Sequence, residues 1–183
     1  RVKVDKLDNL EEYISAEFGQ NQNQTLSFRF LSIFKWETRK GWDILIEAYL
    51  REFMGKKSAV SLYVLTQPYH NEPNYVKHVK NFISEKLADL GEKYDSFPHI
   101  AFLHYPLPQT LLPSLYKSVD AFVLPSRGEG WGRPHVEAMA MGLPAIATNW
   151  SGNLEFMKPW NSYLIKVDKM VEIESGAFKG HLW

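Results

Sequence analysis

Most apolar runs in this chain are continuous, and segments with helical spacing separate them. Such runs are typical of strands that are buried on both faces of a parallel sheet. Strands are predicted at residues 26–34, 59–66, 99–105, 120–126, 144–148 and 162–167. Helices are predicted at residues 40–54, 74–91, 109–119 and 134–142, with a short turn or helix at 151–157. This alternation predicts an α/β fold: a doubly wound, Rossmann-like parallel sheet of about six strands with helices on both faces.

The first 25 residues differ from the rest because they are polar and end in GQNQNQT. We predict that residues 1–25 form a lead-in segment. Residues 26–183 are predicted to form one domain, since this length is enough for a single core. The last residues, FKGHLW, carry no helix cap or polar tail, so we expect the domain to belong to a longer protein.

The composition excludes several kinds of site and partner. The chain has no cysteine, which excludes disulfides, thiolate zinc sites and a cysteine nucleophile. Its formal net charge is zero, so no nucleic-acid partner is expected. The histidines lack metal-ligand spacing and no DxD motif occurs, so no metal or cofactor is expected. Without a signal peptide or a long apolar run, a location in the cytoplasm or on the cytoplasmic face of a membrane is predicted.

The segment after the fourth predicted strand is the first candidate site, because ligands bind beyond the carboxyl ends of parallel strands. It reads RGEGWGRPHVE (127–137), with glycines before a predicted helix. The first amides of a helix are unpaired and favour an anion, so the segment could hold a phosphate or a sugar hydroxyl. A tight turn without a ligand explains the glycines equally well, since the GxGxxG fingerprint is missing.

Charged residues near the same edge are further candidates. Glu137 lies among apolar residues of a predicted helix, where a carboxylate is costly unless it is paired or faces a cleft. It could bind ribose hydroxyls, or it could stabilise the helix N-terminus. Lys35 ends the first predicted strand and Lys40 opens the first predicted helix, with Arg39 beside it. These cations could neutralise a diphosphate, although solvated loop charges are the more common case.

His135 and the tryptophans have simpler interpretations. His135 follows Pro134 at the start of a predicted helix, where an imidazole is more often packed or solvated than bound to a ligand. The tryptophans are spread over different elements without interleaved basic residues. Most of them are therefore interpreted as core or site-wall side chains.

Two long segments resemble a known family. FLSIFKWETRKGWDILIEAY (30–49) resembles the start of the C-terminal domain of GT-B fold glycosyltransferases. LYKSVDAFVLPSRGEGWGRPHVEAMAMGLPAIATNWSGNLEF (115–156) resembles the main signature of the retaining GT4 group, glycosyl transferases group 1. The resemblance spans about residues 26 to 167 and includes an E-x7-E motif at Glu129 and Glu137. It implies the donor-binding half of a retaining, metal-independent, hexosyltransferase-type enzyme.

The resemblance also implies roles for the candidate residues. Lys35 stands where the family usually has an arginine, Lys40 matches its usual lysine, and both would bind the donor diphosphate. Glu129 would face the donor sugar, and Glu137 would hold the ribose hydroxyls. Arg133 replaces a usual aliphatic residue and could contact the donor or be solvated. The other implied donor-binding positions are the glycine-rich loop, Gly128, Gly130, Trp131 and Gly132, and the nucleobase segment, His104 and Tyr105.

The chemistry that the resemblance implies follows from charge. The sugar develops oxocarbenium character while the leaving diphosphate gains negative charge, which lysines and helix amides would stabilise without a metal. Retention is usually attributed to departure and attack on one face, with the leaving phosphate assisting the acceptor. Glu129 would then position the sugar. The expected partners are a nucleotide-sugar donor, UDP- or GDP-linked, the protein's own N-terminal domain, and an unknown glycan, lipid or protein acceptor.

Two alternatives remain open at the level of sequence. A GT-B relative such as a nucleotide-sugar epimerase or a phosphorylase would share the fold, although GEGWGRPHVEAMAMGLPAIAT favours the group 1 enzymes. A non-catalytic module would also keep the fold, although the presence of both lysines and both glutamates favours a working donor site. Because the acceptor site would belong to the N-terminal domain, this fragment is expected to be inactive alone.

Overall fold

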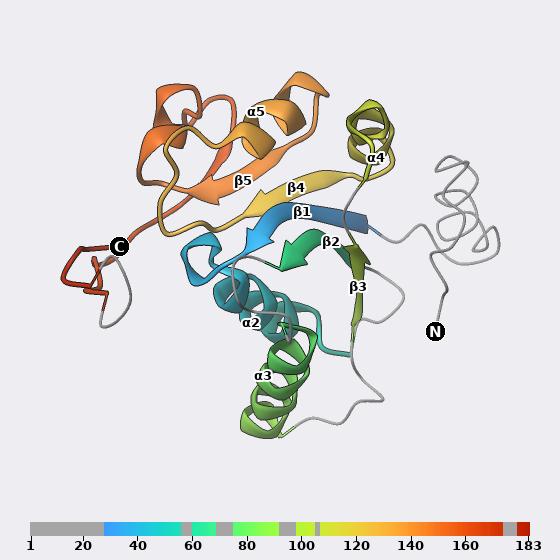
Figure 1. Cartoon of the computed structure of the whole chain (residues 1–183), viewed down its shortest axis with the longest axis vertical. Coiled ribbons are helices and arrows are strands. Elements are labelled where there is room, and N and C mark those ends of the chain that lie inside the picture. The colour runs from blue at the N-terminus through green and yellow to red at the C-terminus, as the bar shows by residue number, and fades with distance from the viewer. Residues whose placement is uncertain (1–27, 56–59, 69–74, 92–97, 105–106, 174–178) are drawn as a thin grey trace.

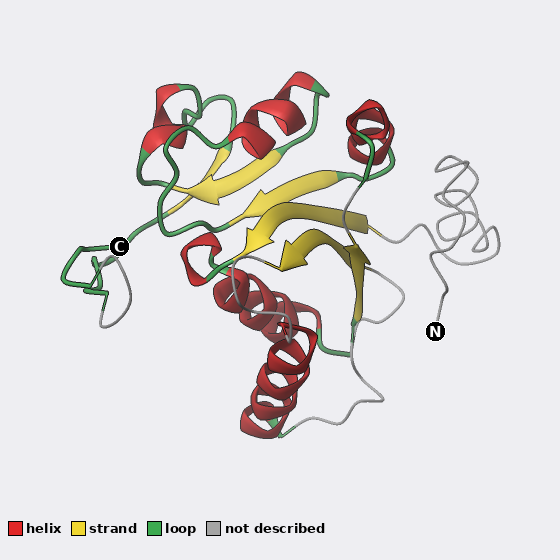
Figure 2. Cartoon of the chain, in the orientation of Figure 1, coloured by secondary structure: helices red, strands yellow, loops and turns green. Residues whose placement is uncertain are grey.

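The computed structural model describes residues 28–55, 60–68, 75–91, 98–104, 107–173 and 179–183. The predicted lead-in, residues 1–25, lies outside them, as does the predicted site residue Tyr105. Helices pack against both faces of one sheet (Figures 1 and 2). None of the helices in the described part of the chain has the length and apolar character of a membrane span.

The sheet has six parallel strands in the order β3-β2-β1-β4-β5-β6, which confirms the predicted doubly wound, Rossmann-like fold. Strand β2 is buried from Val60 to Thr66, and burial on both faces explains why its sequence does not alternate. The strands are β1 (Phe28–Trp36), β2 (Val60–Pro68), β3 (His99–His104), β4 (Ala121–Leu124), β5 (Ala145–Thr148) and β6 (Tyr163–Ile165).

The connecting helices lie close to their predicted positions. Helices α2 and α3 cover one face of the sheet, and α4 and α5 lie on the other (Figure 1). The predicted irregularity near Pro113 is confirmed, because the helix there begins as a 3₁₀ turn. The helices are η1 (Thr38–Lys40), α2 (Trp42–Phe53), α3 (Tyr75–Leu90), η3 (Gln109–Leu111), α4 (Leu112–Lys117), α5 (Arg133–Ala140) and η4 (Gly152–Glu155).

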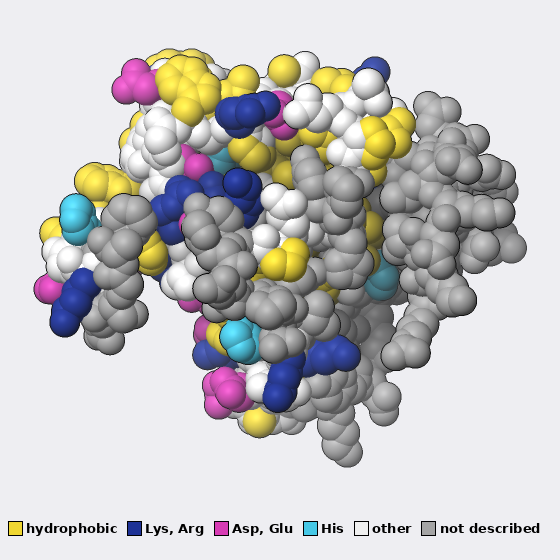
Figure 3. Space-filling model, viewed as in Figure 1, with side chains coloured by type: hydrophobic (Ala, Val, Ile, Leu, Met, Phe, Trp, Pro, Cys, Tyr) yellow, Lys and Arg dark blue, Asp and Glu magenta, His cyan; other side chains and the backbone are white. Residues whose placement is uncertain are grey.

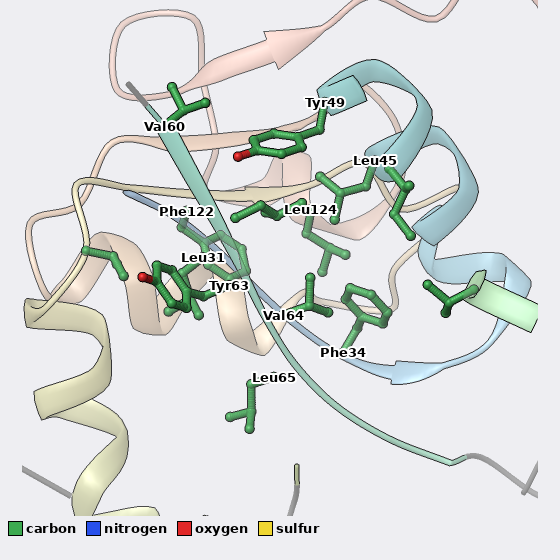
Figure 4. Close-up of a cluster of buried hydrophobic side chains, with 14 of the residues drawn as sticks. Leu31, Phe34, Leu45, Tyr49, Val60, Tyr63, Val64, Leu65, Phe122 and Leu124 are labelled. Atoms are coloured by element: carbon green, nitrogen blue, oxygen red, sulfur yellow. The ribbon is translucent and has the colours of Figure 1, made fainter. Parts of the chain in front are cut away.

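The main hydrophobic core joins the central strands to α2 and α3. Trp36 at the end of β1 is buried and stacks on Trp42 at the start of α2, with ring centroids 4.6 Å apart. This stack fixes how the chain leaves β1, and so where the segment between these two residues lies. Figure 4 shows side chains of β1, α2, β2 and β4 meeting in one cluster: Leu31, Phe34, Leu45, Tyr49, Val60, Tyr63, Val64, Leu65, Phe122 and Leu124.

Three predicted boundaries beside the candidate site are wrong. Strand β1 continues to Trp36, so Lys35 lies inside the strand, opposite Gln67 of β2, and does not end it. Lys40 does not open α2 but closes the 3₁₀ turn η1. The left-handed backbone of Gly41, with φ of 67°, separates the two helices, which spacing alone could not indicate. Helix α5 begins at Arg133, so the proline takes its second position.

Gly41 is also a position where the structure has no room for a side chain. A Cβ atom there would lie 2.1 Å from the carbonyl oxygen of Pro125, which follows β4. We expect Gly41→Ala to lower the free energy of unfolding by about 3 kcal/mol or more. Gly55 is the matched control, because it has φ of 77° but, among the described residues, no atom within 4 Å of a Cβ. Urea denaturation should show a loss of only about 1 kcal/mol for Gly55→Ala, and equal losses would contradict this account.

Candidate functional site

The candidate site lies where the strand order reverses, between β1 and β4. The chain leaves β1 toward β2 on one side and leaves β4 toward β5 on the other. The segments after these strands therefore diverge at the carboxyl edge of the sheet, which is where ligands bind in such folds. Residues 37–41 follow β1 and residues 125–132 follow β4, and both segments carry predicted site residues.

A buried ion pair connects the two segments. The Lys40 Nζ atom donates hydrogen bonds to both carboxylate oxygens of Glu129, at 2.7 and 2.9 Å. The side chains are 12% and 7% exposed, so water screens their attraction poorly. The Arg39 guanidinium adds a second cation 3.7 Å from the same carboxylate. Two residues to which the family resemblance assigns different parts of a donor are thus hydrogen-bond partners of each other.

The charge state of Glu129 follows from this arrangement. Burial alone raises the pKa of its carboxyl. The hydrogen bonds and positive charge of Lys40 outweigh burial, and Ser126 and Arg39 contribute further, so the pKa lies below its usual value. Glu129 is therefore anionic at neutral pH and cannot serve as a proton donor there.

Further hydrogen bonds hold the two segments together around the ion pair. The Arg39 carbonyl accepts from the Arg127 amide at 2.7 Å and from the Ser126 hydroxyl at 3.1 Å. The Arg39 guanidinium donates to the Gly128 carbonyl. The Arg127 guanidinium binds the Asp43 carboxylate bidentately at 2.8 and 2.6 Å. The geometry of the ion pair is thus fixed by backbone and side-chain contacts on both sides.

The segment after β5 contributes a serine that binds the backbone of Glu129. The Ser151 hydroxyl accepts from the Glu129 amide at 2.9 Å and donates to the Glu129 carbonyl at 2.7 Å. Ser151 has a positive φ of 79°, a conformation that non-glycine residues adopt only where their surroundings enforce it. The next residue must be glycine, because a Cβ on Gly152 would lie 2.2 Å from the Gly130 carbonyl oxygen.

A cavity of about 520 Å³ lies between β1 and helices α4 and α5. Three predicted site residues, Lys35, Arg133 and Glu137, line it together. Its size and mixed lining are typical of small-molecule sites. Lys40 and Glu129 are not among its lining residues, so the structure separates the predicted residues into a cavity group and an ion-pair group. The other lining residues include the amides Gln67 and Gln109 and the apolar side chains Ile33, Leu112, Pro113, Tyr116, Pro134 and Met141.

A hydrogen bond from helix α4 holds the Glu137 side chain in place. The buried Tyr116 hydroxyl, on α4, donates to one Glu137 carboxylate oxygen at 3.0 Å. The other carboxylate oxygen lies 3.6 Å from the Arg133 guanidinium, one turn earlier on α5. Arg133 is 79% exposed, so this second contact is a weak, solvent-screened pair. Glu137 lines the cavity and lies beyond the first turn of α5, which contains no acidic residue.

The glycine-rich loop presents its backbone to the site and one large side chain to solvent. Gly132 is the N-cap of α5, whose first turn contains no acidic residue. Pro134 has no amide hydrogen and the His135 amide donates to the Gly132 carbonyl at 3.0 Å, so the helix offers a ligand mainly the positive end of its dipole. Trp131 is 52% exposed and rests on the Phe156 ring, with centroids 5.2 Å apart, so it belongs to the surface and not to the core. Of the predicted nucleobase segment, the structure places only the backbone of His104, at the end of β3.

His135 is a packed imidazole, which confirms the simpler of its two interpretations. It is buried beneath the start of α5 and meets the Phe122 ring edge-on at 5.5 Å. Its Nε2 atom faces the Leu124 carbonyl at 3.4 Å, and its Nδ1 atom has no hydrogen-bond partner within the described part of the chain. Burial lowers the pKa of the imidazole, which is therefore neutral in the folded protein at neutral pH.

Sequence reasoning missed three residues that shape the site, Arg127, Ser151 and Tyr116, and the role of a fourth, Arg39. Arg127 opens the segment after the fourth predicted strand and Ser151 opens a predicted turn, but no sequence pattern predicts a contact for either. Arg39 was weighed only as a possible diphosphate cation, whereas the structure shows it tying two segments together. Tyr116 gave no signal beyond its place in a predicted helix. Its hydrogen bond joins residues 21 positions apart, which no local pattern reveals.

The chain matches one family of proteins over most of its length. Residues 27–174 match the family model described as Glycosyl transferases group 1. Mannosylfructose-phosphate synthase from Agrobacterium fabrum is 29% identical over 122 residues, which make up 67% of this chain and 25% of that protein. The chain thus spans about a quarter of the length of the curated relatives it matches.

Solved structures show the same fold. Anabaena HepE, crystallised with UDP and glucose, superimposes with a TM-score of 0.63 at 22% identity, over 84% of this chain and 38% of that one. The C-terminal domain of LpcC, a glycosyl transferase group 1 family protein from Francisella tularensis, gives a TM-score of 0.61 at 23% identity, over 81% and 72% of the two chains. At these identities the likeness establishes the architecture.

The buried, neutral state of His135 predicts a pH-dependent stability. Because burial lowers its pKa, the unfolded chain takes up a proton at a higher pH than the folded chain. The free energy of unfolding should therefore fall as the pH drops below 6.5, the ordinary value for the imidazole. His135→Leu should flatten this dependence between about pH 7.5 and about pH 5.5 in urea titrations. His78→Gln, which removes an exposed histidine, should leave the wild-type slope; an unaltered slope in His135→Leu would contradict the assignment.

Proposed function

The chain belongs to the group 1 glycosyl transferases, and we propose that it is the donor-binding domain of an enzyme that transfers a sugar from a nucleotide sugar to an acceptor. The observation that carries the proposal is the cavity that gathers Lys35, Arg133 and Glu137 at the switch point of the sheet. Two comparisons support it: a relative is named a mannosylfructose-phosphate synthase, and a protein of similar fold was crystallised with UDP and glucose.

The cations of the site suit a departing diphosphate. Lys35 in the cavity wall and Lys40 at the end of η1 supply positive charge on the β1 side. The start of α5 supplies the positive end of a helix dipole on the β4 side, without an acidic residue in its first turn. Fixed charges of this kind stabilise a leaving group without reorganising during the reaction. Chemistry that needs no metal ion is part of the proposal.

Glu129 is proposed to position the donor sugar and to act as an anion throughout. Its lowered pKa argues against a role as general acid, because the carboxyl is already ionised at neutral pH. A negative charge beside a sugar that gains oxocarbenium character is electrostatically favourable. Since Lys40 already binds both oxygens of Glu129, a bound diphosphate would share this lysine with the glutamate.

Finer assignments rest on the E-x7-E motif of Glu129 and Glu137. We assign the chain to the GT4 group and propose that transfer retains the anomeric configuration. Glu137, held in the cavity wall by Tyr116, is placed to accept hydrogen bonds from ribose hydroxyls. An N-terminal domain, an acceptor that is a glycan, lipid or protein, and a cytoplasmic location complete the proposal for the whole protein.

Nucleotide binding tests the donor site directly. Calorimetry with UDP, GDP and ADP should show binding of at least one nucleotide to the chain. Glu137→Ala should weaken that binding by about 1–3 kcal/mol, because a charged acceptor for the ribose is lost. The control is Glu47→Ala, which removes a carboxylate that pairs with Arg51 and Lys86 on α2 and α3, away from the cavity. Unchanged affinity in Glu137→Ala would refute the role of Glu137, and no binding of any nucleotide by the folded protein would refute the donor site.

Product analysis tests the reaction. We expect the full-length protein that contains this domain to convert a labelled nucleotide sugar into a glycoside of retained configuration. The isolated chain should transfer no sugar, since the acceptor site is proposed to lie in another domain. Release of a free epimer or a sugar phosphate would favour an epimerase or a phosphorylase, and an inverted product would refute retention.

A further inference from the structure

The hydrogen bond between Tyr116 and Glu137 indicates which nucleotides the cavity binds, a property that the family match does not specify. We infer that Tyr116 is a positioning residue: it holds Glu137 in the orientation that accepts ribose hydroxyls, so that the cavity selects ribonucleotides over 2′-deoxyribonucleotides. This inference rests on the proposed donor site and names the class of nucleotide that the site takes.

Tyr116 is built rigidly into the wall of the cavity. It is 1% exposed, and its ring packs against Phe122 of β4 with centroids 6.1 Å apart. Its hydroxyl group lies 3.0 Å from a Glu137 carboxylate oxygen and 3.3 Å from the Pro134 carbonyl oxygen, both on α5. A buried tyrosine with its ring fixed by the sheet has little freedom to move its hydroxyl, so it is a firm anchor for the carboxylate.

The anchor leaves the other carboxylate oxygen of Glu137 for a ligand. In the described part of the chain its ion-pair partner is Arg133 at 3.6 Å, and Arg133 is 79% exposed, so this contact is weak. A glutamate side chain that is free to rotate would lose conformational entropy on binding, and a fixed side chain avoids this loss. Tyr116 therefore prepares one acceptor oxygen in the wall of the cavity.

The chemical nature of the anchor matters as much as its position. Glu129 is held by a lysine and an arginine, which compensate its charge. Glu137 is held from inside the protein by a neutral phenol, which fixes the carboxylate without cancelling its charge. A carboxylate that keeps its charge is a strong acceptor for hydroxyl donors, and charge-assisted hydrogen bonds are about twice as strong as neutral ones. The cavity thus carries an acceptor suited to paired hydroxyls.

Selectivity follows from the cost of an unmade hydrogen bond. The Glu137 oxygen that Tyr116 leaves for the ligand has two lone pairs and can accept from both adjacent hydroxyls of a ribose, whereas a 2′-deoxyribose offers one hydroxyl. The second lone pair of that oxygen must then be satisfied by water or stay unsatisfied. A site built to bind a hydroxyl rejects analogues that lack it, provided that the acceptor is held in place. Tyr116 holds the Glu137 carboxylate in place through its hydrogen bond.

The test compares ribonucleotides with 2′-deoxyribonucleotides in calorimetry. The probes are UDP, GDP and ADP and their 2′-deoxy forms, and the pair with the tightest-binding ribonucleotide is used. We expect the wild type to prefer the ribonucleotide by roughly tenfold or more. Tyr116→Phe should weaken ribonucleotide binding roughly fivefold and narrow the preference to about twofold, with little effect on the deoxy form. In a Glu137→Ala background, which removes the acceptor of the Tyr116 hydroxyl, Tyr116→Phe should change neither affinity.

Two controls separate positioning from loss of structure. Tyr49→Phe removes another buried phenol, whose hydroxyl donates to the His99 carbonyl at 2.9 Å and does not line the cavity. It should lower the melting temperature without changing the ribose preference. If Tyr116→Phe does not fold, Glu137→Asp withdraws the carboxylate from the intact tyrosine and should equally abolish the preference.

The outcomes distinguish this inference from the proposed function. A wild type that binds ribonucleotides and deoxyribonucleotides equally, or a preference that survives both Tyr116→Phe and Glu137→Asp, overturns the inference and leaves the donor site standing. A folded wild type that binds no nucleotide overturns both.

Discussion

The Lys40–Glu129 ion pair is the interaction on which the geometry of the site depends. It joins the segment after β1 to the segment after β4 at the one place where the sheet topology makes them diverge. Removing two charges from water is costly, and the cost is offset only when the partners meet in good geometry with their other atoms satisfied. The surrounding contacts meet this requirement: Arg39 and Ser126 complete the polar shell, and Ser151 fixes the glutamate backbone. The close approach of the two segments in turn explains why position 41 must be glycine.

The two carboxylates of the E-x7-E motif, Glu129 and Glu137, have different environments, which fits the separate roles proposed for them. Glu129 is buried between cations, so its charge is fixed and compensated. Glu137 lies in a cavity wall, anchored by a phenol and accompanied by a largely exposed arginine. Across the whole chain the charges cancel, yet lysine and arginine side chains gather on the face shown in Figure 3, near the ends of β1 and β4 seen in Figure 1. A neutral protein can therefore carry a local site for an anionic ligand, because potential depends on where charges lie and not on their sum.

Much of the fold could be predicted from sequence because its causes are local. The apolar run at residues 59–66 predicts a buried strand, and the amphipathic segment at 74–91 predicts a surface helix. Pro113 predicts that the helix around it starts irregularly. The wrong predictions occur where the backbone conformation of a single residue sets the boundary of a helix. Gly41 adopts the left-handed region and moves Lys40 from the helix to the 3₁₀ turn, whereas a glycine in sequence is compatible with either arrangement. The candidate residues do lie at the strand ends, but their contacts with one another were not predicted.

The sequence by itself determined the order of strands and helices, the edge of the sheet that carries the site, and the family, because apolar periodicity and the long group 1 segments are readable along the chain. Only the tertiary structure decided which charges meet. Lys40 and Glu129 are 89 positions apart and Tyr116 and Glu137 are 21 apart, so their distances depend on strand register and helix packing. Hydrogen bonds and ion pairs act over a few ångströms in space, without regard to separation in sequence. For that reason the residue types of the site were visible in the sequence, while their partners, charge states and division into two groups were not.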